Sequence, residues 1–215
     1  SNNIQYTKLG QSVAISGNGN YIFLGNHRTG LETPKHGKLY KIAWGSTDIT
    51  SITLDNPSNY NYGDGTAMNA TAVSCSDDGS VIIVANNKRM KTIGSYIEGC
   101  VLIYKDVDLK ETLTTVINSQ YKTYGKLVAC SLDGLKVAFT NEENNVEVKI
   151  LNSDGNIIES EKIEIVPNSI SFSNDNNSLY IASSNICYTY DYDGTSWSQN
   201  STLTINYNPI KYFFK

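Results

Sequence analysis

The sequence predicts an all-β protein folded as a β-propeller of four-stranded antiparallel blades. Short runs of residues alternate between apolar and polar side chains and are bounded by Gly, Asn and Asp, which is typical of half-buried strands. Four such runs form a unit, and the unit occurs four times along the 215 residues. The spacing between units falls in the range of roughly 40 to 60 residues that propeller blades have.

The first unit, residues 10–54, shows the pattern most clearly. Its strands are predicted at residues 12–16, 21–25, 38–43 and 49–54. The first two strands are joined by Gly-Asn-Gly-Asn, whose residues tolerate the left-handed backbone of a tight turn. The unit is therefore interpreted as an antiparallel meander.

Three further units follow, at residues 70–116, 125–165 and 168–205. Their first strands are predicted at residues 71–76, 126–131 and 169–173, and each is followed by a turn rich in Asp, Asn or Gly. A second, a third and a more polar fourth strand complete each unit. Hairpin connections throughout favour a propeller, because a β-sandwich needs Greek-key crossovers.

The chain is predicted to be one domain, residues 1–215, because no linker divides it. Residues 3–9 resemble an outer strand and residues 208–214 an inner strand, each outside a complete unit. Terminal strands can close a propeller ring by pairing in one blade, which removes exposed sheet edges. The favoured closure is a four-bladed ring with these strands at its seam. The alternatives are an incomplete fifth blade completed by a neighbour, and a piece of a longer propeller.

Short motifs resemble the FG-GAP repeat of integrin-α-type propellers. The matching residues of the first unit are Gly10, Ser12, Val13, Ala14, Gly25, Gly37, Leu39 and Tyr40. The fourth unit ends in an aromatic strand, an Asp-Gly turn and Trp197, as related repeats do. The resemblance implies this repeat type over nearly the whole chain. The calcium loop of the family is missing, because the corresponding turns are too short to surround a cation with six or more oxygens. No cofactor is therefore expected.

Composition and cysteine spacing exclude several classes of protein. A net charge of -4 argues against general nucleic-acid binding, which needs a basic surface. No run of about 18 apolar residues is present, so no membrane span is predicted. The four cysteines form no C-x-x-C pair, which argues against structural zinc. They are predicted to be buried free thiols, because Cys75 and Cys130 take a core position that Ile15 and Phe172 take in the other units.

The loops differ in length, and all long loops are predicted on one face of the disc. Alternate turns of a meander lie on opposite faces, and residues 26–36, 55–69, 87–98 and 118–124 fall on the same one. Loops on a rigid scaffold commonly bind partners, and Tyr and Arg are enriched in recognition surfaces. For any single aromatic residue, packing that holds its loop to the disc is the competing interpretation. The residues predicted to bind on this long-loop face are His27, Arg28, His36, Tyr60, Tyr62, Asp64, Arg89, Lys91, Tyr96, Tyr121 and Tyr124.

No catalytic or metal-binding group of residues is expected. The histidines, His27 and His36, lack the further ligands of a zinc site. No G-x-S-x-G motif is present, and the acidic pairs at 77–78 and 142–143 are expected to be solvated. The segment 191–197 fails the spacing of the sialidase Asp-box because Asp193 directly precedes Gly194, and it is interpreted as a turn.

The chain is therefore interpreted as a non-enzymatic structural or attachment module, binding another protein or a glycan within a larger assembly. Abundant Asn and Tyr suggest a virion component of a large AT-rich virus, which would place it on a virion or an extracellular surface. The alternative is a carbohydrate-active or lyase-type enzyme, which would need a deep pocket at the disc axis. An intracellular WD-like scaffold lacks its G-H and W-D signatures.

Overall fold

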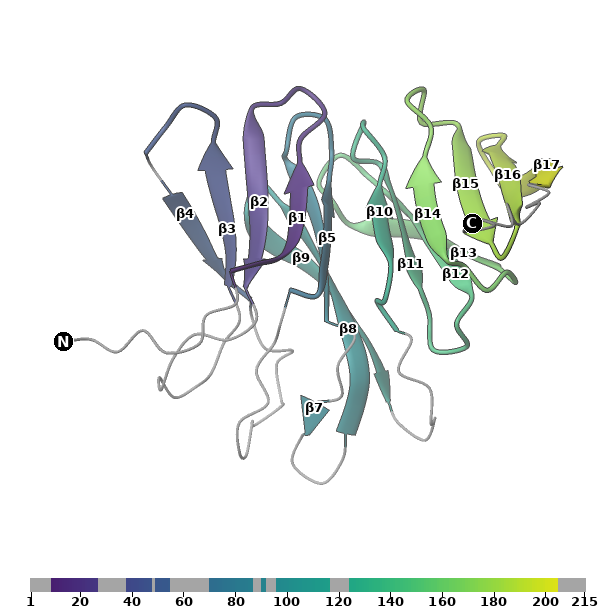
Figure 1. Cartoon of the computed structure of the whole chain (residues 1–215), viewed down its shortest axis with the longest axis horizontal. Coiled ribbons are helices and arrows are strands. Elements are labelled where there is room, and N and C mark those ends of the chain that lie inside the picture. The colour runs from purple at the N-terminus through teal and green to yellow at the C-terminus, as the bar shows by residue number, and fades with distance from the viewer. Residues whose placement is uncertain are drawn as a thin grey trace, which may run out of the picture.

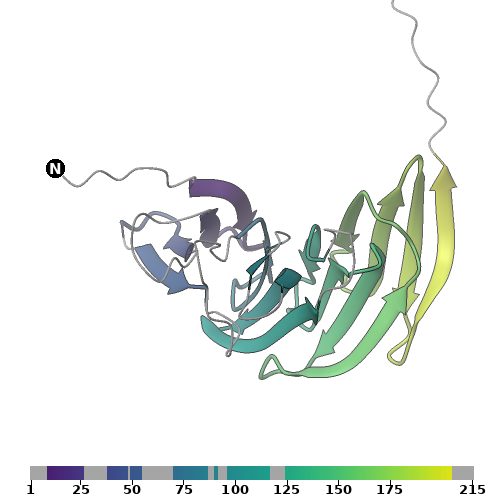
Figure 2. The same ribbon diagram turned by 90° about the horizontal axis from the view of Figure 1, so that it is seen from below.

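The computed structural model describes residues 9–26, 38–47, 49–54, 70–86, 90–91, 96–116 and 124–204. These residues form four antiparallel sheets and no helix. Figures 1 and 2 show the sheets side by side along an open arc, with β1–β4 at one end and β14–β17 at the other. The prediction of an all-β chain is confirmed, as a propeller-like arrangement of four blades.

Each sheet is one blade, numbered first to fourth in chain order. The first contains β1 (Leu9–Ile15), β2 (Tyr21–Asn26), β3 (Lys38–Ala43) and β4 (Ile49–Thr53). The second contains β5 (Ala72–Cys75), β6 (Val81–Asn86), β7 (Met90–Lys91), β8 (Tyr96–Lys105) and β9 (Asp108–Val116). The third contains β10 (Val128–Cys130), β11 (Lys136–Thr140), β12 (Val146–Leu151) and β13 (Ile157–Ile163). The fourth contains β14 (Ser169–Phe172), β15 (Ser178–Ser183), β16 (Ile186–Tyr192) and β17 (Trp197–Thr204).

The second blade departs from the expected pattern in two places. Met90–Lys91 forms β7 and pairs with the start of β8, where a loop over residues 87–98 was expected. The turn between β8 and β9 is limited to Asp106 and Val107, whose φ angles are 50° and 70°. Two consecutive residues with positive φ give a hairpin turn that matches the twist of its strands. The strand β9 therefore begins at Asp108, directly after this two-residue turn.

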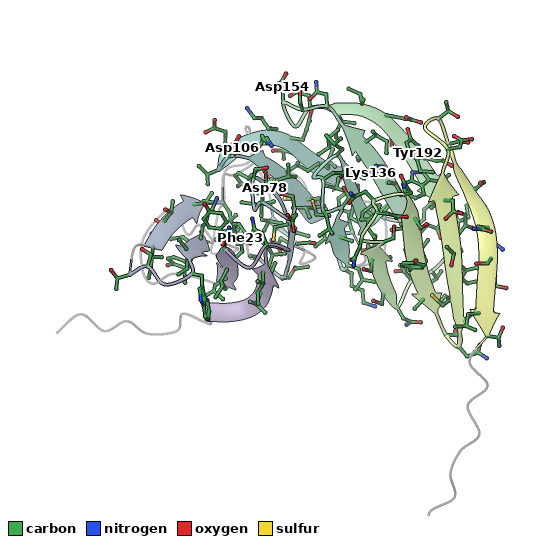
Figure 3. All side chains as sticks on the ribbon, turned by 90° about the horizontal axis from the view of Figure 1, so that it is seen from above. Phe23, Asp78, Asp106, Lys136, Asp154 and Tyr192 are labelled. Atoms are coloured by element: carbon green, nitrogen blue, oxygen red, sulfur yellow. The ribbon has the colours of Figure 1, made fainter. Side chains whose placement is uncertain are left out.

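Three apolar clusters lie between successive blades and hold the arc together. The first includes Phe23, which lies between the first and second blades (Figure 3). Every described residue of β6 and of β11 is buried, because each of these strands packs against a neighbouring blade on both faces. This explains why residues 81–85 and 137–139 are continuous apolar runs, whereas Leu179, Tyr180 and Ile181 in β15 of an end blade alternate between buried and exposed.

Polar contacts add to the apolar packing between the third and fourth blades. The hydroxyl of Tyr192 donates to Glu159 Oε2 at 2.9 Å, and the backbone N–H of Trp197 donates to Glu161 Oε2 at 2.9 Å. The ammonium of Lys136 lies 5.6 Å from the centroid of the Tyr192 ring, a distance at which a cation and an aromatic face attract (Figure 3).

The described blades do not close into the four-bladed ring that the sequence favoured. The inner strands contact one another in the order β1, β5, β10 and β14, and Figure 2 shows the first and fourth blades at opposite ends of the arc. The strands expected at 3–9 and 208–214 lie outside the described residues, except for Leu9, which begins β1. Each end of the arc therefore presents a sheet face that no described blade covers.

Candidate interaction surfaces

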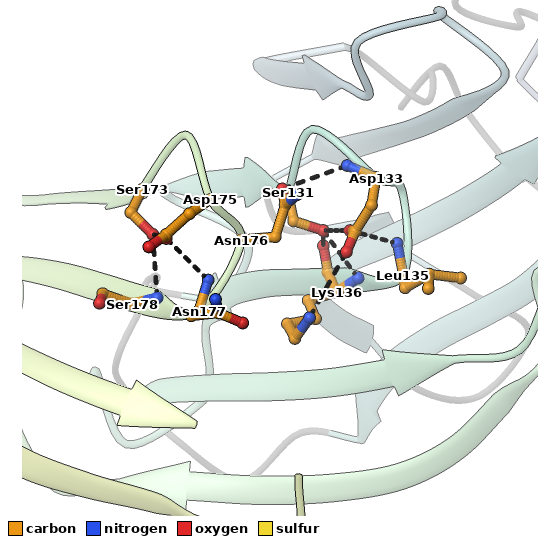
Figure 4. Close-up of polar contacts among 9 residues, drawn as sticks. All are labelled: Ser131, Asp133, Leu135, Lys136, Ser173, Asp175, Asn176, Asn177 and Ser178. Carbon is orange, nitrogen blue, oxygen red and sulfur yellow. Dashed lines mark hydrogen bonds and ion pairs between the residues drawn. The ribbon is translucent and has the colours of Figure 1, made fainter. Parts of the chain in front are cut away.

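A serine-containing turn joins the first two strands of every blade. In the third blade, Ser131 Oγ donates to Asp133 Oδ1 at 2.5 Å and accepts from the backbone N–H of Lys136 at 2.9 Å (Figure 4). Asp133 Oδ1 also accepts from the backbone N–H of Leu135 at 2.9 Å. One hydroxyl and one carboxylate oxygen thus bind the polar groups of the turn, which short Asp and Ser side chains do well.

The other three turns repeat this network. The serine donates to Asn18, Asp78 and Asp175 at 2.8, 2.7 and 2.5 Å respectively. The residue that follows this Asn or Asp has a left-handed backbone in all four turns. It is glycine in three turns and Asn176, at φ 65°, in the fourth. Glycine adopts this conformation without strain, and Asn tolerates it better than most residues.

The four turns are also joined from blade to blade. The N–H of Asn18 donates to the carbonyl of Asp77 at 3.1 Å, and the N–H of Asp77 donates to the carbonyl of Leu132 at 2.8 Å. The N–H of Asp133 then donates to Asn176 Oδ1 at 3.2 Å (Figure 4). These bonds fix the spacing of the blades along one rim, so the turns are structural elements.

Hydrogen bonds favour the ionised form of two carboxylates in these turns, Asp78 and Asp175. The hydroxyl of Ser173 and the N–H of Asn177 lower the pKa of Asp175. Burial raises the pKa of Asp78, but hydrogen bonds from Ser80 and Ser76 outweigh burial and leave this pKa below its ordinary value. Asp78 therefore stabilises its turn, and is not only a solvated charge as the sequence suggested.

The Asp-Gly turn before Trp197 is confirmed as turn chemistry. Asp193 Oδ1 accepts from the N–H groups of Thr195 and Ser196 at 2.8 and 2.9 Å, and from the Thr195 hydroxyl at 2.7 Å. The hydrogen bond from the Thr195 hydroxyl is the main cause of the lowered pKa of Asp193. The carboxylate is thus engaged by its own turn.

Most of the residues predicted to bind on the long-loop face lie outside the described residues, namely His27, Arg28, His36, Tyr60, Tyr62, Asp64, Arg89 and Tyr121. The backbones of Lys91 and Tyr96 pair as part of β7 and β8. For Tyr124 the prediction is wrong, because its side chain is 6% exposed. The centroid of its ring lies 5.6 Å from the centroid of the Phe139 ring. Burial also raises the pKa of its hydroxyl. Tyr124 anchors the start of the third blade in the core.

The four cysteines are free, as the sequence predicted. Cys75, Cys100 and Cys130 are buried, whereas Cys187 is half-buried on the fourth blade. Among the described residues, no three His, Cys, Asp or Glu side chains lie close enough together to hold a metal ion. No helix that could cross a membrane is found in the described part of the chain.

The free face of the first blade is strongly apolar. Directly paired residues share a face of a sheet, and the register aligns Ile15, Ile22, Ile42 and Ile49 in one row across β1–β4. A second row aligns Val13, Leu24, Tyr40 and Ser51, and Lys38 lies on the same side of the sheet, two residues before Tyr40. We call this surface the apolar end face, and it consists of Val13, Ile15, Ile22, Leu24, Tyr40, Ile42 and Ile49.

The positions of the apolar end face are core positions in the next blade. Cys75, Ile82 and Tyr104 form the corresponding row of the second blade, where they are buried against the first blade. In the first blade, by contrast, Val13 is 59% exposed, Ile15 62% and Ile49 60%. Ile15 was predicted at a core position, and its exposure could not be recognised from the sequence, because the same alternation is found in both blades.

The free face of the fourth blade has the opposite character, and we call it the polar end face. Tyr180, which takes the place of the buried Phe23 and Ile83 of other blades, is 41% exposed. A shallow hollow of about 520 Å³ lies beside it, lined by Ser171, Phe172, Ser173, Asn174, Asp175 and Tyr180. The register places the remaining members of the polar end face on the same side, namely Ser169, Ser178, Ala182, Cys187, Thr189, Asp191, Ser198, Ser201 and Leu203.

No family model matches the chain, and no curated protein matches it in sequence. Among solved structures, a protein of Desulfotomaculum acetoxidans DSM 771, described as functionally unknown, matches 92% of this chain with a TM-score of 0.54 and 12% identity. Hydrazine synthase of Kuenenia stuttgartiensis matches 85% of this chain with a TM-score of 0.47 and 13% identity. The matches cover 56% and 64% of those two chains, so this chain spans less than two thirds of either. The likeness to the first structure shows the fold alone, a propeller-like array of antiparallel blades.

Proposed function

We propose that this protein is a non-enzymatic structural module that docks onto another protein through the apolar end face. The observation that carries the proposal is the exposed isoleucine row of the first blade, in which Ile15 and Ile49 are 62% and 60% exposed. Exposed apolar patches that extend across a sheet mark interaction sites on soluble proteins.

Burial of these apolar side chains would stabilise a complex with a partner. Fully burying one side chain such as Ile or Val contributes roughly 1.5–3 kcal/mol, and the apolar end face brings several of them together. Part of this gain is offset by the loss of rotational and translational freedom on association. A partner that covers the whole face would still be held specifically.

We also propose where this module acts. The composition rich in Asn and Tyr, together with the resemblance to FG-GAP repeats, supports a virion or another extracellular surface assembly. The long-loop face remains the proposed contact for a further protein or glycan. The alternative of a propeller enzyme has less support, because the hollow on the polar end face is lined by residues of one blade and not by several blades around an axis.

The test is the mass of the native complex that contains this chain. Wild-type protein is expected in a complex much heavier than the 23.7 kDa of one chain. The variant Ile15→Asp/Ile49→Asp is expected to leave the complex, because carboxylates cannot be buried there without a partner. Leu203→Asp, at an exposed position of the polar end face, is the matched control and should stay in it. A wild-type chain found only at its own mass, or a double variant that stays in the complex, would contradict the proposal.

A further inference from the structure

We infer that the hollow on the polar end face binds a neutral saccharide, which packs on the ring of Tyr180 and forms hydrogen bonds with Asp175 and Asn174. The hollow is separate from the apolar end face, so this inference does not rest on the proposed function. Three features of the hollow support such a ligand: the exposed aromatic ring, the polar groups beside it and a lining without cations.

Tyr180 is surrounded by small side chains. The register pairs it with Ser171 on β14 and with Thr189 on β16. Ser178 and Ala182, two residues away on β15, lie on the same side of the sheet. None of these side chains is large enough to cover the ring, and Tyr180 is 41% exposed. The ring therefore offers an apolar surface to a ligand, and its hydroxyl can donate and accept a hydrogen bond.

The side chains of the polar end face suit contact with water and polar ligands. Tyr180 is the third residue of β15, and the third residues of β2, β6 and β11 are Phe23, Ile83 and Ala138, which are all fully buried. In the fourth blade, by contrast, hydroxyl groups flank this position and Asp191 lies on the same side of the sheet. An apolar cover would take these groups out of water without giving them partners, which is costly. A ligand with hydroxyl groups of its own avoids this cost.

Asp175 contributes a charged acceptor to the hollow. Its Oδ1 accepts from the Ser173 hydroxyl at 2.5 Å and from the N–H of Asn177 at 3.1 Å (Figure 4). These bonds hold the carboxylate in place and lower its pKa, chiefly through the Ser173 hydroxyl. Within the described part of the chain, no group donates to Oδ2. This oxygen can therefore accept from a sugar hydroxyl, and a hydrogen bond to a charged acceptor is roughly twice as strong as a neutral one.

The lining favours a neutral sugar over an anion or a purely apolar molecule. The six residues that line the hollow include one carboxylate and no Lys, Arg or His, so a phosphate or sulfate group would be repelled. A purely apolar ligand would leave Asp175 and Asn174 without partners. A hexose has C–H groups on one face, which pack on an aromatic ring, and hydroxyl groups around its edge. The volume of about 520 Å³ lies within the roughly 300–1,000 Å³ of small-molecule sites.

The experiment is saturation-transfer NMR of the purified full chain with the methyl glycosides of glucose, galactose, mannose and N-acetylglucosamine. Because the hollow is shallow and open, at least one glycoside should bind with a dissociation constant on the order of 1 mM. The 6-sulfated form of that sugar should bind at least about tenfold more weakly, because its charge faces Asp175. Absence of binding by all four glycosides, or equal binding of the sulfated sugar, would overturn the inference.

The source of the sugar is tested by displacement of the bound glycoside. Displacement by N-glycans released from a glycoprotein would place the sugar on a protein, whereas displacement by a soluble polysaccharide of the same sugar would place it in a polysaccharide. Both results support the saccharide site. Failure of both to displace the glycoside would overturn it.

Four variants locate the binding. Tyr180→Ser leaves a hydroxyl as small as those of its neighbours and should weaken binding at least about tenfold, whereas Tyr180→Phe keeps the ring and should stay within about threefold of the wild type. Asp175→Asn should bind the neutral sugar more weakly and discriminate less against the sulfated one. Leu203→Ser, at an exposed position of the same face outside the hollow, is the matched control and should bind like the wild type.

The variants also separate this inference from the proposed function. Wild-type binding by Tyr180→Ser with unchanged circular dichroism, or loss of binding in Leu203→Ser, would overturn the saccharide site. Ile15→Asp/Ile49→Asp changes only the apolar end face and should bind the sugar like the wild type. Tyr180→Ser should stay in the native complex. Each site can therefore fail without the other.

Discussion

Ile15 takes the place in the first blade that Cys75 takes in the second, yet Ile15 is 62% exposed and Cys75 is 7% exposed. Both residues lie in the inner strand, and each pairs with an isoleucine of the next strand, Ile22 and Ile82 respectively. The difference arises because the second blade has a described neighbour on this side and the first blade has none. At this end of the arc, a position that is buried in the next blade is therefore exposed.

This difference predicts unequal costs for the same substitution. Ile82→Ala should lower the free energy of unfolding by about 2–5 kcal/mol, because it leaves a cavity in the core. Ile15→Ala should change it by less than about 1 kcal/mol. Urea unfolding followed by tryptophan fluorescence measures both. Equal costs would show that another part of the chain covers Ile15.

The serine of each turn is expected to stabilise its blade measurably. Ser76 is buried, donates to Asp78 Oδ1 at 2.7 Å and accepts from the N–H of Val81 at 3.0 Å. Ser76→Ala should therefore lower the free energy of unfolding by about 2 kcal/mol, since it leaves a buried N–H without this acceptor. Ser153→Ala, at an exposed position of another turn, is the control and should have an effect within about 0.5 kcal/mol. Similar effects of the two substitutions would refute a stabilising role for the network.

The thiols should differ in reactivity according to burial. Burial raises the pKa of Cys75 and of Cys100 to about 12, so neither forms a thiolate at pH 8. Burial also raises the pKa of Cys130. Iodoacetamide at pH 8 should therefore modify the half-buried Cys187 first in the native chain, and all four cysteines after unfolding. Intact mass and peptide mapping give the order. Early labelling of Cys75 would contradict the described core.

Stability should fall in acid because of the turn carboxylates. The folded chain lowers the pKa of Asp175 and of Asp193 below the ordinary value of 3.8. A lowered pKa adds stability above the unfolded value, and this stability is lost as the pH falls through the folded value. The melting temperature should therefore be nearly constant from about pH 7 to 5 and decrease below about pH 4.

Asparagine variants test whether these two groups cause the acid effect. Asp175→Asn/Asp193→Asn keeps an oxygen acceptor in each turn but removes the titrating carboxyl groups. Its melting temperature should depend less on pH below about pH 4 than that of the wild type. If the melting temperature of the variant depended on pH as that of the wild type does, other carboxylates would cause the loss of stability in acid.

The sequence by itself determined the local structure of the chain. The alternation in residues 21–25 and the residues of the turn at 17–20 predicted strands and a hairpin that the structure confirms, because both depend on neighbours along the chain. The core positions of Cys75 and Cys130 were also predictable, since they repeat from unit to unit. The serines that begin the turns were visible as a repeat, but their bonds to the Asp or Asn two residues later were not inferred.

Only the tertiary structure decided which repeated positions are covered. Tyr124 was expected at a binding surface and lies in the core, because the start of the third blade packs it against Phe139. Ile15 was expected in the core and is exposed, because burial of a blade face depends on the presence of the next blade and not on the strand that carries it. Alternation specifies that a face is apolar, whereas the neighbour that buries it is set by contacts between residues far apart in the sequence.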